Sequence, residues 1–239
     1  MIIQGKDVYF TDLNKAIKQA DATEVTVENI IGQRYIGSGV EGKNLILYGT
    51  PGNALGAYLD NCNITVHGNV QDAVGDTMNN GEIIVHGNGG DTLGYAMRGG
   101  AIYVKGNGGY RVGIHMKEYK ELKPVIVVGG KVGSFLGEYQ AGGIIVILGL
   151  GVENTFPTGN YCGTGMHGGV MYIRSDVPPA NLPRHLIVKK CIKEDLNQII
   201  PFIKNYCQLF NVKEADIFQK SFYKLTPGAN HYNTIYAPN

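Results

Sequence analysis

Two glycine-rich strings in this sequence have the spacing of a dinucleotide-binding loop, GSGVEG at 37–42 and GTGMHG at 163–168. In such a loop the glycines let the backbone approach a pyrophosphate, and the helix that follows supplies its N-terminus. Neither string lies between an expected strand and an expected helix, and the glycines of both are in phase with a repeat. We therefore expect turns at these positions and no bound nucleotide.

Pairs of acids and histidines also recur at fixed spacing. Asp72 and Asp91 stand 19 residues apart and could bind a metal ion, but side chains that cap equivalent turns explain the spacing more simply. His67 and His86 form a second pair, followed by Lys105, at a position that alternates with apolar ones and so favours a solvated outer face. The sequence holds no serine–histidine–aspartate order, no CxxC pair and no P-loop. We expect no catalytic, metal-binding or cofactor-binding residue on this chain.

Charged and aromatic side chains gather next to an insertion at residues 117–124. Arginine and tyrosine are enriched at interface hot spots, whereas lysine is depleted there. A solvated face is the alternative explanation for these charges. Arg111 and Tyr119 are the expected anchors. The predicted partner interface comprises Arg98, Arg111, His115, Lys117, Glu118, Tyr119 and Glu138.

The element that must position these residues is a 19-residue repeat, whose key glycines are Gly37, Gly56, Gly75, Gly94 and Gly113. An apolar residue precedes each key glycine, a second one follows three positions later, and a β-branched run comes next. Two further units, keyed on Gly137 and Gly163, follow at spacings of 24 and 26 residues. The excess residues are expected to form loops, either by tolerated drift or as a binding surface.

The length of the unit limits the fold. Nineteen residues with one clear strand and several glycine turns are too few for a propeller blade or a helix pair, but suit one coil of a solenoid. The six-residue rhythm of left-handed hexapeptide helices is absent. We therefore predict an all-β fold, a right-handed parallel β-helix of about seven coils with helical N- and C-terminal caps. Met78, Met97 and Met116 should stack inside.

The flanks predict the caps. A strand is expected at residues 8–10 and a helix at 13–20. Beyond the repeat, apolar stripes over 196–210, interrupted by one proline, and over 213–225 predict helices; residues 227–239 are expected to be irregular. The predicted domains are an N-terminal cap at 1–29, the β-helix at 30–174, and a helical C-terminal cap and tail at 175–239.

Composition excludes several function classes. The net charge of +1 gives no electrostatic drive toward nucleic acid or an anionic membrane. No apolar run approaches the length of a membrane span, and the N-terminus lacks the order of an export signal. Cys62, Cys162, Cys191 and Cys207 lack metal-ligand spacing and are expected as reduced thiols in a cytoplasm. A cytoplasmic protein without nucleic-acid or membrane partners is predicted.

Longer strings carry a family resemblance. The sequences GYRVGIHMKEY at 109–119, KPVIVVGG at 123–130 and GTGMHGG at 163–169 closely resemble the GXGXG β-helix domain that ends the large subunit of glutamate synthase. The resemblance spans residues 30–174, and the tail KEADIFQKSFYKLTP is similar to the family's closing helix. A subunit of formylmethanofuran dehydrogenase is a more distant relative with the same repeat.

The resemblance implies a non-catalytic subunit that acts as a rigid spacer. The family's amidotransferase domain uses an N-terminal cysteine, whereas position 2 here is Ile2. This sequence also has no FMN barrel and no cluster-binding run of cysteines. FMN and an iron–sulfur cluster are therefore expected on partner subunits, and the expected partners are an amidotransferase and an FMN-barrel protein of glutamate synthase. Self-association into a homo-oligomer is left open.

The favoured function is thus a scaffolding subunit of a glutamate synthase-type complex in glutamate biosynthesis. The alternative is a subunit of formylmethanofuran dehydrogenase or of another oxidoreductase complex. A third class, a freestanding carbohydrate-active β-helix enzyme, needs clustered acids in a groove, for which Asp72 and Asp91 are the nearest candidates.

Overall fold

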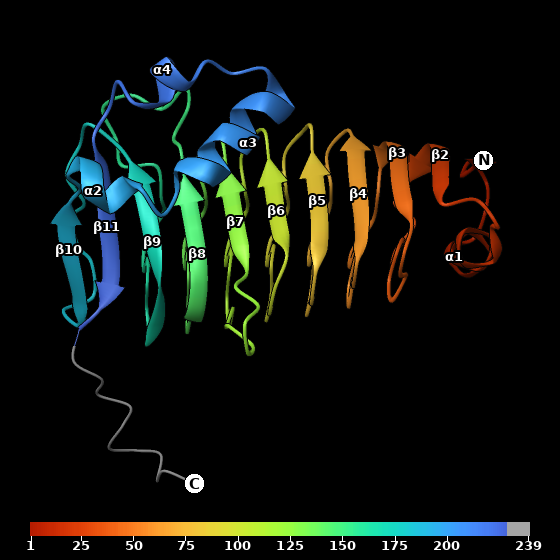
Figure 1. Ribbon diagram of the computed structural model, residues 1–239, viewed down its shortest axis with the longest axis horizontal. Coiled ribbons are helices and arrows are strands. Elements are labelled where there is room, and N and C mark those ends of the chain that lie inside the picture. The colour runs from red at the N-terminus through yellow and green to blue at the C-terminus, as the bar shows by residue number, and fades with distance from the viewer. Residues whose placement is uncertain (229–239) are drawn as a thin grey trace, which may run out of the picture.

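The computed structural model describes residues 1–228, whose strands form one open sheet along the length of the molecule (Figure 1). The 11 strands follow the order β1-β2-β3-β4-β5-β6-β7-β8-β9-β11-β10. All pairings from β1 to β9 are parallel, and β11 pairs antiparallel with β9 and β10. The elements are β1 (Ile2–Gln4), α1 (Phe10–Gln19), β2 (Glu24–Ile31), β3 (Asn44–Thr50), β4 (Cys62–His67), β5 (Gly81–Val85), β6 (Ala101–Val104), β7 (Val125–Val128), β8 (Ala141–Ile147), β9 (Gly168–Arg174), β10 (Leu186–Lys190), α2 (Lys193–Leu196), α3 (Ile200–Phe210), α4 (Glu214–Ile217) and β11 (Phe222–Pro227).

The register of the sheet follows the sequence repeat. Ile64 pairs with Ile83, and Ile83 pairs with Ile102, so from β3 to β6 each paired residue stands beside the residue 19 positions further along. The two insertions leave the pairing intact, because Ile102 pairs with Ile126 across the first and Ile145 with Met171 across the second. The seven strands predicted within the repeat are confirmed.

The remainder of each repeat is a layer of turns rather than a second strand. In the unit keyed on Gly75, residues Ala73, Gly75 and Thr77 all have positive φ, at 58°, 66° and 54°. Two successive turns result, closed by bonds from Asp76 N to Ala73 O (3.3 Å) and from Met78 N to Gly75 O (3.1 Å). A strand requires strongly negative φ at every residue, so this segment cannot join a sheet. The predicted right-handed parallel β-helix is therefore wrong, and the fold is a single open, mostly parallel sheet with a few helices.

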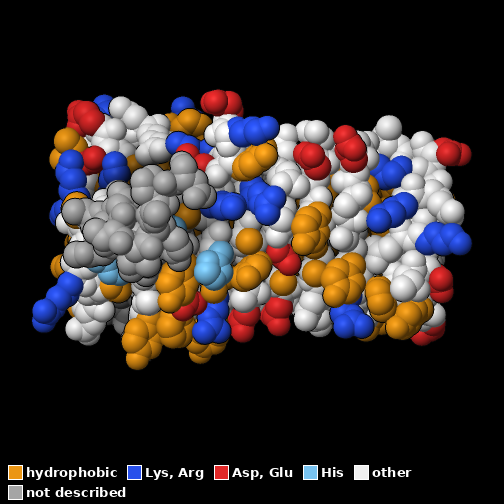
Figure 2. Space-filling model, turned by 90° about the horizontal axis from the view of Figure 1, so that it is seen from below, with side chains coloured by type: hydrophobic (Ala, Val, Ile, Leu, Met, Phe, Trp, Pro, Cys, Tyr) orange, Lys and Arg blue, Asp and Glu red, His pale blue; other side chains and the backbone are white. Residues whose placement is uncertain are grey.

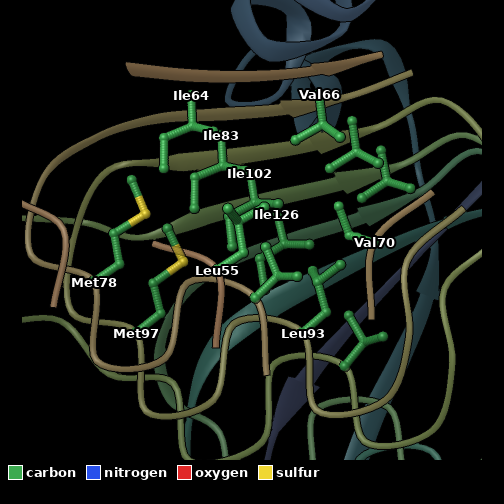
Figure 3. Packing of buried hydrophobic residues seen from close by; sticks show 14 of the residues in the cluster. Leu55, Ile64, Val66, Val70, Met78, Ile83, Leu93, Met97, Ile102 and Ile126 are labelled. Atoms are coloured by element: carbon green, nitrogen blue, oxygen red, sulfur yellow. The ribbon is translucent and has the colours of Figure 1, made fainter. Parts of the chain in front are cut away.

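The main core lies between the inner face of the sheet and the turn layer. Figure 3 shows Ile64 and Ile83 on successive strands and Met78 and Met97 on successive turn segments, pointing into the same core. Met78, Met97 and Met116 are each 0% exposed. The predicted burial of the methionine column is confirmed.

Gly75 shows why a glycine recurs once in each repeat. Its φ is +66°, and a Cβ at this position would stand 2.6 Å from Cδ1 of Ile102 on the next strand but one. Only glycine adopts this conformation without cost, and only a hydrogen leaves room for the isoleucine. The period of the sequence therefore reflects one backbone conformation and one packing contact.

Asparagine and aspartate side chains link successive repeats on the surface. Oδ1 of Asn69 accepts from the backbone N–H of Asn88, and Oδ1 of Asn88 accepts from Asn107, both at 2.8 Å. Oδ1 of Asp72 accepts from Asp91 N at 2.9 Å, and Oδ1 of Asp91 accepts from Tyr110 N at 2.7 Å. The asparagines thus form a ladder, and the two aspartates are acceptors for the backbone of the next repeat.

The ends of the sheet are strands, so the predicted helical caps are also wrong. At the N-terminal end β1 is the edge strand, and the strand expected at 8–10 does not form because α1 begins at Phe10. The helix expected at 13–20 is present as α1, with Leu13 and Ile17 in the core.

At the C-terminal end of the sheet, β11 and β10 extend the sheet beyond β9. The helix predicted at 213–225 is wrong because α4 ends at Ile217 and Phe222–Pro227 pairs with β9. Of the irregular tail predicted at 227–239, residues 229–239 lie outside the described residues.

A second core forms on the outer face of the sheet, where α3 crosses the strands (Figure 1). The helix predicted over 196–210 appears as α2 and α3, with a proline in the first turn of α3. Tyr206 on α3 is fully buried and donates from its hydroxyl to Lys105 O at 3.0 Å. Arg174 on β9 donates to Leu148 O (3.0 Å) and Ile217 O (2.6 Å), which ties α4 to the sheet. Within residues 1–228, no helix has the length and apolar character needed to cross a bilayer.

Candidate functional site

Arg111 and His115 leave the turn layer on its outer side. They have φ values of 57° and 55° and flank Gly113 at φ 70°, so the intervening Val112 and the following Met116 point inward and are buried. Their amides donate to the next repeat, Arg111 N to Ser134 O and His115 N to Glu138 O, both at 2.9 Å. Left-handed conformations are costly for residues with a Cβ, and these inter-repeat bonds hold them in place.

Arg111 is fixed by an acid and an aromatic ring. Its Nε lies 3.0 Å from Oε2 of Glu138, and its guanidinium stands 5.0 Å above the ring of Phe135. Phe135 in turn stacks on Tyr161 with ring centroids 4.9 Å apart. The Arg111 side chain remains 49% exposed, so the ion pair contributes little to stability. Glu138 and Phe135 thus hold the Arg111 side chain in position while it stays accessible to solvent.

His115 lies in a parallel column of rings. It stacks on Tyr139 at 5.3 Å with an interplanar angle of 7°, and Tyr95 meets it edge-on at 5.9 Å. All three side chains are exposed. Together the two columns form a surface that we term the aromatic–arginine band. The band consists of Tyr95, Arg111, His115, Phe135, Tyr139 and Tyr161.

The remaining predicted interface residues lie beside the band, towards the start of the strands. Tyr119 opens a tight loop closed by two backbone bonds with Leu122 (3.1 and 3.0 Å), and Lys120 stands over its ring at 5.3 Å. Glu118 Oε1 accepts from Gly143 N at 3.1 Å and lies 3.7 Å from Lys123 Nζ.

The other two predicted cations, Arg98 and Lys117, stand 19 residues apart, at equivalent positions of neighbouring repeats. Lys117 is exposed, and its amide donates to Met97 O at 3.0 Å. Nε of Arg98 is buried without a hydrogen-bond partner among the described residues. The structure therefore brings Arg111, His115 and Glu138 together, and it places Arg98 and Lys117 on a separate row next to them.

Four members of the band were not predicted from the sequence. Phe135 and Tyr161 stand two residues before Gly137 and Gly163, the same position that Arg111 occupies before Gly113. The signal was therefore present in the repeat, but the two longer spacings obscured it. Tyr95 follows its key glycine, Gly94, by one residue, and Tyr139 follows Gly137 by two.

The other candidate chemical groups have structural roles. His86 is half-buried, stacks on exposed His67 at 4.8 Å and meets Phe210 of α3 edge-on at 5.2 Å. The solvated face predicted for this pair therefore holds for His67 but not fully for His86. The partial burial of His86, together with the charges of His67 and Lys105, lowers the pKa of its ring. The two glycine-rich strings form turns.

The cysteines are free thiols in the described chain, as predicted. Burial raises the pKa of Cys162 to about 12, and burial with the nearby Asp195 charge raises that of Cys191 to about 11, so both favour the unreactive thiol form. No group of three or more histidine, cysteine, aspartate or glutamate residues in the described part of the chain is arranged to hold a metal ion.

Comparisons with known proteins agree with this repeat architecture. The family model for the GXGXG motif matches residues 6–229. The uncharacterized protein MJ1350 of Methanocaldococcus jannaschii is 38% identical over 253 aligned positions, which cover 100% of this chain and 97% of that protein. A chain in the crystal structure of the formyltransferase/hydrolase complex FhcABCD of Methylorubrum extorquens, solved with methylofuran, has a TM-score of 0.62 at 18% identity. That alignment covers 87% of this chain and 80% of the other, and it shows a shared fold.

Proposed function

Because this chain belongs to the GXGXG motif family, we propose that it is a structural subunit of an oxidoreductase-type enzyme complex and that it docks a partner through the aromatic–arginine band. The observation that carries the proposal is the band itself: a half-exposed arginine held over a phenylalanine, beside a row of stacked exposed rings. Asp72 and Asp91, the nearest candidates for an acid pair, are occupied as hydrogen-bond acceptors between repeats.

The band has the properties of a protein-binding surface. Arginine and tyrosine dominate interface hot spots, and side chains that are already held by stacking and by an ion pair lose less conformational entropy on binding. Figure 2 shows apolar, basic and acidic side chains interspersed over one face of the molecule, without an extended field of one sign. Such a mixed surface favours a protein partner over nucleic acid.

Two complexes are compatible with the proposal. The shared fold with a chain of the formyltransferase/hydrolase complex favours a role like that of the formylmethanofuran dehydrogenase subunit. The strings GYRVGIHMKEY and GTGMHGG favour glutamate synthase, in which the partners would be an amidotransferase and an FMN-barrel protein. The similarity to MJ1350 is compatible with both. In each case this chain would hold catalytic partners in a fixed relation.

Affinity purification of the tagged chain from the cells that produce it, with mass spectrometry of the bound proteins, tests the role. Recovery of formylmethanofuran dehydrogenase subunits supports the first complex, and recovery of an amidotransferase with an FMN-barrel protein supports the second. If the tagged chain elutes without any enzyme subunit, the proposed function is refuted.

A matched pair of variants tests the docking face. Arg111→Ala combined with Tyr139→Ala should reduce partner recovery. Tyr58→Ala should not, although Tyr58 also has positive φ, at 57°, and is 59% exposed on an earlier repeat. Equal losses from both variants would place the interface elsewhere.

A further inference from the structure

A groove lies on the outer face of the sheet, away from the turn layer. One wall is the loop at residues 117–124, contributing Leu122 and Lys123, and the other is Phe202 on α3. The floor is formed by the beginnings of β5, β6 and β7, with Glu82 and Ala101 among its residues, and the volume is about 360 Å³. Because the loop also carries Tyr119, the groove adjoins the predicted partner interface.

Glu82 is a carboxylate without a counter-ion. It is half-buried, and among the described residues its carboxylate accepts a single hydrogen bond, a long one of 3.5 Å from Nδ2 of Asn205. Glu82 forms no ion pair among the described residues, and Lys123 on the loop wall lies 3.7 Å from Oε1 of Glu118. Burial raises the pKa of Glu82, as expected for a carboxylate that has lost water without gaining a cation. A cation entering the groove would reverse this effect.

The side chains that line the groove indicate which cation fits. Leu122, Val125 and Ala101 are apolar, and Phe202 adds an aromatic side chain. A guanidinium is planar, weakly hydrated and able to lie against an aromatic ring while it bonds a carboxylate, whereas an ammonium is a strongly hydrated point charge. Glu121 on the rim adds a second negative charge, which favours a cation further.

We propose that this groove binds an arginine side chain presented by a partner protein, with the guanidinium paired to Glu82 and its stem packed between Leu122 and Phe202. The proposal rests on the proposed function only for the identity of the protein that carries the arginine. The site itself can be tested on the isolated chain.

The test is an NMR titration of the isotope-labelled full chain with a capped Gly-Arg-Gly peptide. The same peptides with citrulline, a neutral analogue of the same shape, and with lysine serve as comparisons. We expect saturable shifts at the amides of residues 81–82, 100–101, 121–123 and 125. Affinity should fall by about tenfold or more for citrulline, since a charge-assisted bond becomes neutral, and lysine should bind more weakly than arginine.

Glu82→Gln should cause a loss of about the same size, because it keeps the shape of the side chain and removes the charge. Glu121→Gln, on the rim, should have a smaller effect. Equal binding of arginine and citrulline, equal binding of lysine, or unchanged binding by the Glu82 variant would overturn the site. If the chain binds the peptide but co-purifies with no enzyme, the arginine site is supported and the proposed function is refuted. If the chain co-purifies with an enzyme but does not bind the peptide, the proposed function is supported and the arginine site is refuted.

Discussion

Replacing Gly75 by alanine isolates the interaction that sets the period of the repeat. The substitution forces a residue with a Cβ to adopt φ +66° and places that Cβ 2.6 Å from Cδ1 of Ile102. The left-handed conformation costs about 1–2 kcal/mol, and overpacking a buried site costs about 1–3 kcal/mol. The free energy of unfolding should therefore fall by about 2–5 kcal/mol.

Gly39 offers a matched control for the conformational part of this cost. Its φ is +58°, and a Cβ there would meet no atom within 4 Å. Gly39→Ala should therefore cost only about 1–2 kcal/mol. Denaturant unfolding followed by far-UV circular dichroism compares the two variants. For a chain of this size each kcal/mol corresponds to a change in Tm of about 2–4 °C.

A second substitution tests the contact with Ile102 directly. Ile102→Val removes the clashing methyl group and by itself should cost about 0.5–1.5 kcal/mol. In the Gly75→Ala background the same change should cost at least about 0.5 kcal/mol less, because the two residues share one space. Equal destabilisation by Gly75→Ala and Gly39→Ala, or strict additivity with Ile102→Val, would refute the packing argument.

Four further predictions concern other parts of the molecule. Met97→Ala should lower the free energy of unfolding by about 2–5 kcal/mol, and an unchanged Tm would contradict its inward position. Asp91→Asn should leave the free energy of unfolding nearly unchanged, because asparagine keeps the oxygen that accepts from the next repeat. Asp91→Ala removes this acceptor and should lower the free energy of unfolding by about 0.5–1.5 kcal/mol. Equal losses in equilibrium unfolding would argue against a role in linking the repeats. Arg111→Ala or Tyr119→Ala should weaken assembly with a purified partner by more than about 1 kcal/mol, with circular dichroism as the folding control, and wild-type affinity in both would exclude them as anchors. Burial and neighbouring charges lower the pKa of His86, so the folded state favours the neutral ring. As the pH falls below about 6.5, the unfolded state binds a proton first, and the free energy of unfolding should decrease. His86→Gln should flatten this part of the plot of stability against pH.

The amino-acid sequence alone was sufficient to identify the repeat, its strands and its buried columns. Parallel strands in register place each residue beside its counterpart one repeat away, so the 19-residue columns correspond directly to rows in the structure, as Met78 and Met97 show. The sequence also indicated Arg111 and His115 as interface candidates, because charge gathers there next to the insertion at 117–124.

The number of sheets was decided only by backbone conformation. The alternation of inward and outward residues around Gly75 is the same in a strand and in two successive turns. The positive φ values of Ala73 and Thr77 leave no mark on residue type, since both residues ordinarily prefer negative φ.

Long-range pairing decided the rest. The 213–225 segment has helical spacing, but β9 presents an open edge, and Phe222 to Leu225 satisfy the backbone groups of that edge by pairing with it. An unpaired buried amide or carbonyl is costly. Glu82 and Asn205 are 123 residues apart in sequence and meet only because α3 packs across the sheet. No local pattern specifies such a contact, because it depends on how two cores bury their apolar surfaces at once.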